Sequence, residues 1–345
     1  MTSKDQYALE VNNLAVEFAT YGGTVKAVRN VSFKLRKGTT LAIVGESGCG
    51  KSVTVQSIMG LIPMPPGKIT SGSALLNGEE ILGLRQDRLN EYRGKRIGMI
   101  FQDAMSALNP TMTIGDQIAE TLIVHRGLDK KSAWAEVISL LALTQISEPD
   151  RRALQYPFEL SGGMLQRVMI AMSLACQPDV LIADEPTTAL DVTIQAQILN
   201  LLRSLQEKQG LSIILITHDL GVVARMAHDV AVMYAGQIVE TGSVDDIFYR
   251  SAHPYTVGLK DAMPSNKTVD QELRVIEGSP PDLFAPPVGC GFYARCAHAM
   301  KVCENNTPIL FGTNHVARCW LHHAKAPVHP LQQSLKVPYQ STSIK

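Results

Sequence analysis

Residues 45–52 read Gly45-Glu46-Ser47-Gly48-Cys49-Gly50-Lys51-Ser52, which fits the phosphate-binding loop pattern G-x-x-x-x-G-K-[ST]. An apolar, β-branched run at 40–44 precedes this stretch, and a helical pattern at 53–61 follows it. A strand that leads into a helix through a glycine-rich turn directs several backbone N–H groups and a helix N-terminus toward one place. The stretch therefore predicts a site for nucleotide phosphates rather than an ordinary turn that happens to precede a lysine.

Two side chains at the end of this loop have predicted roles of their own. The Lys51 ammonium would reach the β- and γ-phosphates, and the Ser52 hydroxyl would ligate Mg²⁺. We therefore expect the chain to bind a nucleoside triphosphate together with Mg²⁺.

The composition narrows the class of protein. The chain has 345 residues, of which 45% are hydrophobic, enough for two domains or for one large domain with an appendage. Its 32 basic residues balance its 32 acidic ones, which argues against capture of nucleic acid by net charge. The first residues lack the apolar core of a signal peptide, and no apolar run approaches the ~18 residues of a spanning helix. We expect a cytoplasmic protein that depends on other subunits if it works at a membrane.

Apolar runs predict the elements of the core. Short alternating runs at 9–18 and 25–35 predict an antiparallel pair of strands. Continuous apolar runs at 180–183 and 212–216 are typical of parallel strands that are covered on both faces. The helical pattern at 193–209 between them completes a βαβ unit. The fold class is therefore α/β with a mainly parallel sheet.

The pattern of the chain changes at two places. Between 113 and 153, apolar residues recur at helical spacing, which predicts a helical region. After about residue 250, closely spaced prolines interrupt any long element. We therefore expect a nucleotide-binding domain at 1–250 and a small, irregular, Pro-rich module with four cysteines at 251–345.

Polar side chains follow the two later strands of the predicted sheet. Asp184 and Glu185 come after the run at 180–183, and His218 follows the run at 212–216. Ligands bind at the carboxyl ends of parallel strands, so these side chains should converge with the phosphate loop. Asp184 suits the Mg²⁺ shell, Glu185 can act as general base on the attacking water, and His218 can hold the γ-phosphate and that water in line. A lone strand-end histidine would more simply be solvated, but three strands ending in this way indicate a catalytic site.

A second glycine-rich helix start has the sequence Leu160-Ser161-Gly162-Gly163-Met164-Leu165-Gln166. The N–H groups of Ser161 and Gly163 would lie at a helix N-terminus, where a γ-phosphate is favoured. An ordinary helix start with a serine cap would account for Ser161 but not for the paired glycines. We therefore predict a further phosphate-binding element here.

The order of these motifs resembles that of the nucleotide-binding subunits of ABC transporters, over residues 7 to about 250. By this resemblance the motifs are Walker A at 45–52, the Q-loop glutamine Gln102, the signature at 160–166, Walker B at 180–185, the D-loop Ala189-Leu190-Asp191 and the switch histidine His218. The resemblance implies a P-loop NTPase (RecA-like) core with an antiparallel β subdomain and a helical subdomain at about 103–165. It also implies ATP and Mg²⁺ as cofactors.

The arrangement of this family implies which residues bind ATP. Two such domains dimerise head to tail, and each ATP lies between Walker A of one domain and the signature of the other. Gln102 would link the γ-phosphate and Mg²⁺ to the surface that holds the transmembrane subunits, and either Phe18 or Tyr21 would stack on the adenine. The implied ATP-binding residues are Gly45, Glu46, Ser47, Gly48, Cys49, Gly50, Lys51, Ser52, Ser161, Gly162, Gly163, Gln166 and Asp191, and those implied for Mg²⁺ are Ser52, Gln102 and Asp184.

The later part of the chain gives a narrower resemblance. The stretch His253-Pro254-Tyr255-Thr256 and the Pro-rich cysteine module after it resemble the oligopeptide and dipeptide importer ATPases, as does the Q-loop run at 101–110. Ala104 and Ala107 depart from the proline and serine expected in that run, and Cys49 stands where serine is more usual. Because backbone amides bind the phosphates, these departures do not threaten ATPase function.

The narrower resemblance implies an ATP-hydrolysing subunit that energises the import of di- and oligopeptides. Its partners would be two transmembrane permease subunits, a second ATPase subunit of identical or homologous sequence and, indirectly, an extracytoplasmic solute-binding protein, with no nucleic acid. It would lie peripherally on the cytoplasmic face of the plasma membrane.

Three alternative functions have to be weighed against this one. The same branch includes importers of nickel and of other small solutes. A soluble ABC protein of translation or DNA repair is a second alternative, but the chain has one phosphate loop and no sustained heptads. An Fe–S sensor that uses ATP only as a signal is a third, and the presence of Glu185 and His218 argues for turnover instead.

Four of the six cysteines lie within 30 residues of one another, at Cys290, Cys296, Cys303 and Cys319. Both [4Fe–4S] clusters and Zn²⁺ accept four thiolates, but structural zinc usually prefers closer C-x₂₋₄-C pairs. The dipeptide-importer ATPases that this region resembles can carry a [4Fe–4S] cluster here, so we expect these cysteines to hold one. Zn²⁺ and bare thiols are the alternatives, and His298 and His315 are further candidate ligands.

Overall fold

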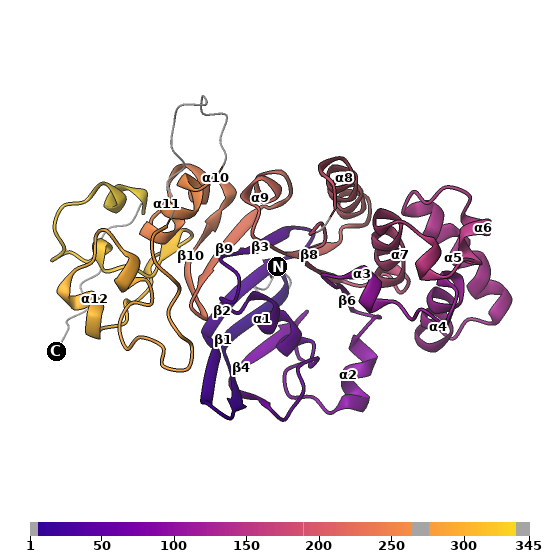
Figure 1. Ribbon diagram of the computed structural model, residues 1–345, viewed down its shortest axis with the longest axis horizontal. Helices are drawn as coiled ribbons and strands as arrows, with labels where there is room; N and C mark the ends of the chain where they lie inside the picture. Colours follow the sequence, from indigo (N-terminus) through magenta and orange to yellow (C-terminus); the bar gives the residue numbers. More distant parts are fainter. Residues whose placement is uncertain (1–5, 189, 264–275, 336–345) are drawn as a thin grey trace. The chain divides into compact units, whose positions relative to one another are not determined.

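The computed structural model describes residues 6–188, 190–263 and 276–335, and Figure 1 labels most of its elements. The chain divides into two compact units. The first comprises Met1–Glu10, Lys34–Thr40 and Ala74–Thr217, and the second comprises Val11–Phe33, Leu41–Ser73 and His218–Lys345. Because the chain passes repeatedly from one unit to the other, three long strands contribute residues to both: β1 (Tyr7–Thr20), β2 (Gly23–Arg36) and β4 (Gly67–Leu76).

Parallel strands form the centre of the first unit. They are β6 (Ile97–Ile100), β7 (Val180–Asp184) and β8 (Ser212–Thr217), with β7 paired to both of the others. All their residues are buried, which explains the continuous apolar runs, because a strand covered on both faces needs apolar side chains on both. Since the strands are parallel, the carboxyl ends of β7 and β8 lie at the same edge of the sheet.

Helices make up most of the rest of the first unit. They are α2 (Gln86–Tyr92), α3 (Ala104–Ala107), α4 (Ile114–Arg126), α5 (Lys130–Leu143), α6 (Pro149–Ala153), α7 (Gly162–Leu174) and α8 (Val192–Gln209), with the short strand β5 (Glu79–Glu80) and a 3₁₀ turn at Pro157–Glu159. Side chains of Thr113, Asp129 and Asp191 accept backbone N–H bonds at the starts of α4, α5 and α8. Left-handed Gly127 and Gly210 end α4 and α8. The helical pattern at 113–153 thus corresponds to α4, α5 and α6.

The second unit contains a mixed set of strands. Strand β3 (Thr40–Val44) runs parallel to β9 (Asp229–Tyr234), and then β10 (Gln237–Ser243), β12 (Val316–Ala317) and β11 (Phe311–Gly312) continue antiparallel in that order. Its helices are α1 (Lys51–Ile58), α9 (Leu220–Met226), α10 (Val244–Tyr249), α11 (Pro254–Asp261) and α12 (Lys301–Asn305), and its 3₁₀ turns are Tyr293–Arg295, Trp320–His322 and Pro330–Ser334. The short β11 and β12 were not predicted, because two residues are too few to show a periodic pattern.

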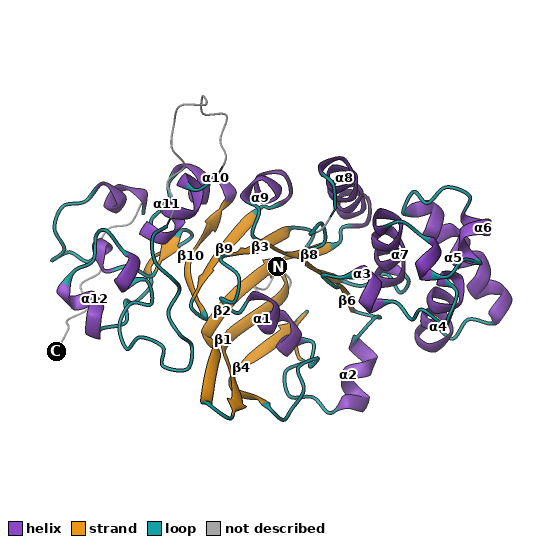
Figure 2. Cartoon of the chain, in the orientation of Figure 1, coloured by secondary structure: helices purple, strands orange, loops and turns teal. Residues whose placement is uncertain are grey.

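The segment after residue 250 shares its core with the sheet of the second unit. Most of its described part is loop (Figure 2). The ring centroid of Phe292 lies 5.3 Å from that of Tyr234 in β9 and 5.4 Å from that of Tyr255 in α11. Cys290 and Cys296 pack against the same apolar cluster. The segment after residue 250 therefore packs on the sheet of the second unit through shared aromatic and apolar contacts. The domain boundary near residue 250 stays a prediction.

Candidate functional site

The phosphate loop joins β3 to α1 in the second unit. Two of its glycines are required by close backbone contacts. A Cβ on Gly45 would lie 2.1 Å from the carbonyl oxygen of Met233, and one on Gly50 would lie 2.4 Å from that of Ala27. Gly50, which caps α1, also has a φ of 102°, a value that favours glycine. The loop is thus held against β2 and β9 at both ends.

The Lys51 side chain crosses the loop that it ends. It is buried, and its Nζ donates to the carbonyl oxygens of Gly45 and Glu46 at 2.8 and 3.0 Å. The neighbouring Cys49 thiol is buried as well, and this burial raises its pKa. Cys49 is therefore a neutral packing residue in the loop.

Three predicted site residues meet at the carboxyl end of β7 in the first unit. Asp184 is the buried last residue of the strand. Glu185 follows it with a left-handed φ of 47°, and its N–H donates to the Ile216 carbonyl at 2.9 Å. Its Oε2 accepts hydrogen bonds from Gln102 Nε2 at 3.1 Å and from Thr188 Oγ1 at 2.9 Å. The backbone conformation and the two donors together fix the direction of this carboxylate.

The signature residues lie at the start of α7. Ser161 is the exposed N-cap residue, and its side chain makes no capping hydrogen bond. A Cβ on Gly163 would lie 2.8 Å from Ile194 Cγ2, so this glycine allows α7 to pack on α8. Gly162 has no such restriction, since the nearest atom would be 3.8 Å away. Gln166 is buried, and its Nε2 has no hydrogen-bond partner within the described chain.

The remaining motif residues are divided between the two units. His218 is exposed and opens the last segment of the second unit, directly after β8. Asp191 caps α8 in the first unit by accepting the Ile194 N–H at 2.9 Å, while Ala189 of the D-loop lies outside the described residues. The phosphate loop and His218 thus belong to the second unit, and the other motifs belong to the first. The predicted convergence of the two groups stays a prediction.

Two residues that contact the phosphate loop were not predicted as site residues. The Tyr255 hydroxyl accepts the Glu46 backbone N–H at 2.9 Å. The Arg295 guanidinium donates to both carboxylate oxygens of Glu46, at 2.7 and 3.0 Å. Tyr255 stands in the stretch 253–256 that suggested the family, which is the one signal by which it could have been found. Arg295 carries no such signal.

The four clustered cysteines line one small pocket of the second unit together with His253. Burial raises the pKa of Cys290 to about 11 and that of Cys319 to about 12, so these groups are neutral thiols at pH 7. As the side chains stand, the described residues include no group of three or more His, Cys, Asp or Glu arranged to hold a metal ion. The expected cluster is therefore not supported by this arrangement.

The two histidines considered as alternative ligands differ in their surroundings. His315 is buried away from the cysteine pocket, with its Nε2 2.7 Å from Glu240 Oε1. His298 does line that pocket, and its Nδ1 lies 3.3 Å from His329 Nε2. His298 is therefore the better placed of the two.

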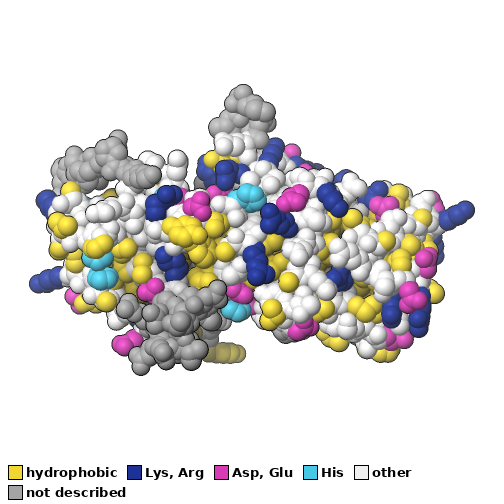
Figure 3. Space-filling view, turned by 90° about the horizontal axis from the view of Figure 1, so that it is seen from above, with side chains coloured by type: hydrophobic (Ala, Val, Ile, Leu, Met, Phe, Trp, Pro, Cys, Tyr) yellow, Lys and Arg dark blue, Asp and Glu magenta, His cyan; other side chains and the backbone are white. Residues whose placement is uncertain are grey.

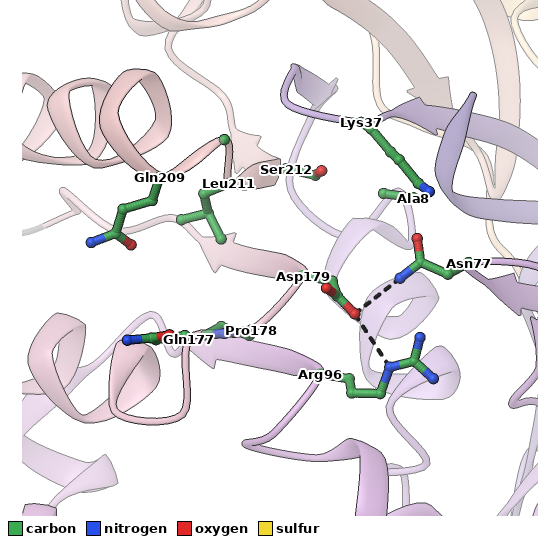
Figure 4. A pocket seen from close by; sticks show the side chains of 11 residues that line it. Ala8, Lys37, Asn77, Arg96, Gln177, Pro178, Asp179, Gln209, Leu211 and Ser212 are labelled. Atoms are coloured by element: carbon green, nitrogen blue, oxygen red, sulfur yellow. Dashed lines mark hydrogen bonds and ion pairs between the residues drawn. The ribbon is translucent and has the colours of Figure 1, made fainter. Parts of the chain in front are cut away.

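A separate polar pocket lies in the first unit at the amino ends of β7 and β8 (Figure 4). Asp179, just before β7, accepts hydrogen bonds there from Asn77 Nδ2 at 2.9 Å and from Arg96 Nε at 3.2 Å. Nucleotides bind at the opposite, carboxyl ends of parallel strands. This pocket is therefore not part of the predicted nucleotide site.

Two features of the described residues concern contact with a membrane. On the face that Figure 3 shows, basic and acidic side chains are interspersed. Within the described parts of the chain, every helix is too short or too polar to cross a membrane.

Comparisons with known proteins agree with the motifs. Residues 28–188 match the family model described as "ABC transporter", and residues 239–303 match "Oligopeptide/dipeptide transporter, C-terminal region". The dipeptide transport ATP-binding protein DppD of Bacillus subtilis is 55% identical over 320 residues, which cover 92% of this chain and 96% of DppD. The oligopeptide transport ATP-binding protein OppD of Salmonella typhimurium is 51% identical over 301 residues, 87% of this chain and 89% of OppD.

Solved structures show the same fold. The dimeric structure of the ABC transporter cassette MJ0796 has a TM-score of 0.62 and 28% identity, and covers 68% of this chain and 98% of the cassette. CbiO1 from Clostridium perfringens has a TM-score of 0.59 and 29% identity, with 70% and 91% covered. The prediction of an α/β P-loop NTPase core is thereby confirmed as the ABC ATPase cassette. The chain therefore belongs to the family of ATP-hydrolysing, ATP-binding subunits of oligopeptide and dipeptide ABC transporters.

Proposed function

We propose that this protein hydrolyses ATP to energise the import of di- and oligopeptides. The observation that carries the proposal is the match of residues 239–303 to the C-terminal region of oligopeptide/dipeptide transporters, because this region lies outside the motifs common to ABC ATPases. The relatives that match along most of the chain are named for peptide transport as well. These names favour peptides over nickel or another small solute.

The partners follow from the family. Two transmembrane permease subunits would form the path for the peptide, and a solute-binding protein outside the membrane would deliver it. This chain would lie peripherally on the cytoplasmic face and pair with a second ATPase subunit, identical or homologous. The dimeric cassette among the similar structures supports such a pair.

At the ATP site, we assign phosphate binding to the amides of the loop at 45–52 and to Lys51. The Lys51 ammonium now donates to two carbonyl oxygens of its own loop, and phosphate oxygens would replace them as acceptors. Ser52 and Asp184 would hold Mg²⁺, which neutralises phosphate charge in the transition state. For the adenine we favour Tyr21, which is fully exposed in the turn between β1 and β2, over the partly buried Phe18.

We assign Glu185 as the general base, with His218 holding the γ-phosphate and the attacking water. The Gln102 side chain contacts the Glu185 carboxylate directly. A movement of the Q-loop would therefore change the position of the base, which gives the membrane subunits a short route to the hydrolysis step. The signature residues Ser161 and Gly163 would contact ATP held by the partner subunit.

The substrate is tested by reconstitution. The full chain, co-purified with its permease subunits and supplied with the binding protein, should take labelled di- or oligopeptides into liposomes only when ATP is present. Parallel assays should use Ni²⁺ and other small solutes. Uptake of Ni²⁺ without any uptake of peptide would contradict the proposal.

We also propose that Cys290, Cys296, Cys303 and Cys319 hold a [4Fe–4S] cluster once their thiols draw together. One support is the pocket that all four line. A second is His253, whose burial lowers its pKa to about 3 and so keeps the ring neutral. Its Nδ1 accepts the Tyr255 N–H at 3.1 Å, which places the proton on Nε2.

The His253 Nε2 then carries a proton but makes no hydrogen bond of good geometry within the described chain, where the Arg318 backbone is its one polar neighbour that affects the pKa of the ring through a hydrogen bond. Buried donors without a partner are uncommon, and a sulfur acceptor in the pocket that His253 lines would satisfy this one. Four thiolates are the usual ligand set of a [4Fe–4S] cluster, which would supply cross-links to a segment with few regular elements. Its role would be structural, because the ATP motifs do not include it.

We expect iron and inorganic sulfide in equal amounts, with broad visible absorption, in protein purified without oxygen. Cys303→Ala should remove most of the iron and weaken assembly with the membrane subunits, while ATP still binds at Lys51. Cys176→Ala is the matched control, because this thiol lies in the first unit and should leave the iron content unchanged. One zinc per chain, or four titratable thiols without metal, would contradict the cluster.

A further inference from the structure

Glu46, the second residue of the phosphate loop, is held by three side chains. Its N–H donates to the Tyr255 hydroxyl at 2.9 Å, and its carbonyl accepts from Lys51 Nζ at 3.0 Å. Its carboxylate accepts from Nη1 and Nη2 of Arg295 at 2.7 and 3.0 Å. Tyr255 and Arg295 stand 209 and 249 residues away along the chain, so distant segments set the shape of the loop here.

Arg295 is itself fixed by further contacts. Nε donates to the Glu277 carbonyl at 2.9 Å, Nη2 to the Ile276 carbonyl at 3.1 Å and Nη1 to the Tyr234 hydroxyl at 3.2 Å. Only 6% of its side chain is exposed, and 24% of that of Glu46. A two-pronged, largely buried guanidinium–carboxylate contact is stronger and more directional than a surface ion pair. The orientation of the Glu46 carboxylate is therefore well defined.

The charge of Glu46 matters because of where it stands. It brings a carboxylate into the loop that has to receive the negatively charged phosphates of a nucleotide. Like charges at close range repel, and a partly buried pair is screened less than an exposed one. Arg295 neutralises this carboxylate. Without Arg295 the loop would carry an unpaired negative charge next to its ligand.

We propose that Arg295 is a positioning residue of the ATP site: it neutralises Glu46 and holds the phosphate loop in its binding shape. The inference rests on the proposed role of this loop in ATP binding. Arg295 directly precedes Cys296 and belongs to the 3₁₀ turn Tyr293–Arg295 between Cys290 and Cys296. The segment that lines the cysteine pocket is therefore also a structural part of the ATP site.

The test measures the Kd for MgATP of the full chain by titration calorimetry. Arg295→Ala should weaken binding roughly tenfold or more, as expected for loss of hydrogen bonds to a charged group. Arg295→Lys should fall between the parent and Arg295→Ala, because lysine keeps the charge but not the two-pronged contact. Glu46→Gln alone removes the negative charge from the loop and serves as the reference for the double variant.

The double variant Arg295→Ala/Glu46→Gln separates positioning by charge from a merely structural role. It should recover most of the lost affinity, because it leaves no unpaired carboxylate in the loop. A purely structural defect would not be repaired by a second substitution that removes another partner. Arg203→Ala is the matched control, since it breaks a helix ion pair whose arginine side chain is 60% exposed, and it should bind MgATP like the parent.

Lys51→Ala distinguishes failure of this inference from failure of the proposed function. If Lys51→Ala binds MgATP normally, the loop is not the ATP site. If Lys51→Ala loses binding but Arg295→Ala binds as tightly as the parent, the positioning role alone is wrong. Should Arg295→Ala fail to fold, Arg295→Lys decides: an affinity equal to that of the parent overturns the role.

Discussion

Replacing Glu185 by glutamine is expected to leave ATP binding intact and to lower the ATPase rate of the assembled transporter at least ~100-fold. Glu185 follows Asp184 at the end of β7, where a carboxylate can take a proton from the attacking water. Glutamine has nearly the same shape but cannot accept that proton. The loss should therefore appear in kcat, while the Kd for MgATP changes little.

The contacts of Glu185 make this substitution a clean test. Its Oε2 accepts hydrogen bonds from Gln102 and Thr188, and a glutamine carbonyl oxygen can accept the same bonds. The backbone at residue 185 is left-handed in the parent, so the parent and Glu185→Gln share any energetic cost of that conformation. Thr188→Ala serves as the control, because it removes one orienting bond and should lower the rate by much less. A near-normal rate for Glu185→Gln in the assembled transporter would remove Glu185 from the role of base.

The elements that the sequence predicted well are those whose signal is local. The phosphate loop needs a strand, a glycine-rich turn and a helix in succession, and all three lie within residues 40–58. The strands β7 and β8 are continuous apolar runs because both of their faces are buried. The start of α8 is marked by a capping aspartate and its end by a glycine, both readable from the chain.

The features that the sequence did not predict depend on residues far apart in the chain. The Arg295–Glu46 contact spans 249 residues, and no local pattern marks either partner for it. The pairing of β12 with β10 involves two residues of the later segment, too few for a periodic signal. For this reason, the sequence pattern predicted a separate irregular module and did not indicate that this segment shares a sheet and a core with the strands beside the phosphate loop.

In the candidate site, too, local motifs could be predicted from the sequence and contacts between distant residues could not. Each motif could be placed on its strand end or helix start, because each is a short run with fixed spacing. The Gln102–Glu185 contact could not, because it joins the second residue after β6 to the first residue after β7. The four cysteines were noticed by their crowding, yet their spacing gave neither the shared pocket nor the unpaired Nε2 of His253.

Replacing Ser161 by arginine is expected to abolish turnover of the assembled transporter without weakening ATP binding to the isolated chain. Ser161 is exposed at the start of α7, and its side chain makes no capping bond, so the helix loses little. In the proposed head-to-tail pair, however, this position faces the γ-phosphate of the ATP held by the partner subunit. A bulky side chain there would block closure and displace the amides that stabilise the transferred phosphoryl group.

The magnitude and the controls follow from that geometry. Loss of one preorganised donor set typically costs ~10²–10³-fold in rate, so the ATPase activity of Ser161→Arg should fall at least that far. Ser161→Ala should be much milder, because it keeps the backbone N–H groups at the helix start. Gly163 is not a suitable alternative position for this test, since a Cβ there would strike Ile194 and disturb the packing of α7 on α8.

The decisive comparison sets the Kd for MgATP of the isolated full chain against the ATPase rate of the assembled transporter. If affinity falls as steeply as turnover, the signature acts on ATP bound to its own subunit and the head-to-tail arrangement is wrong.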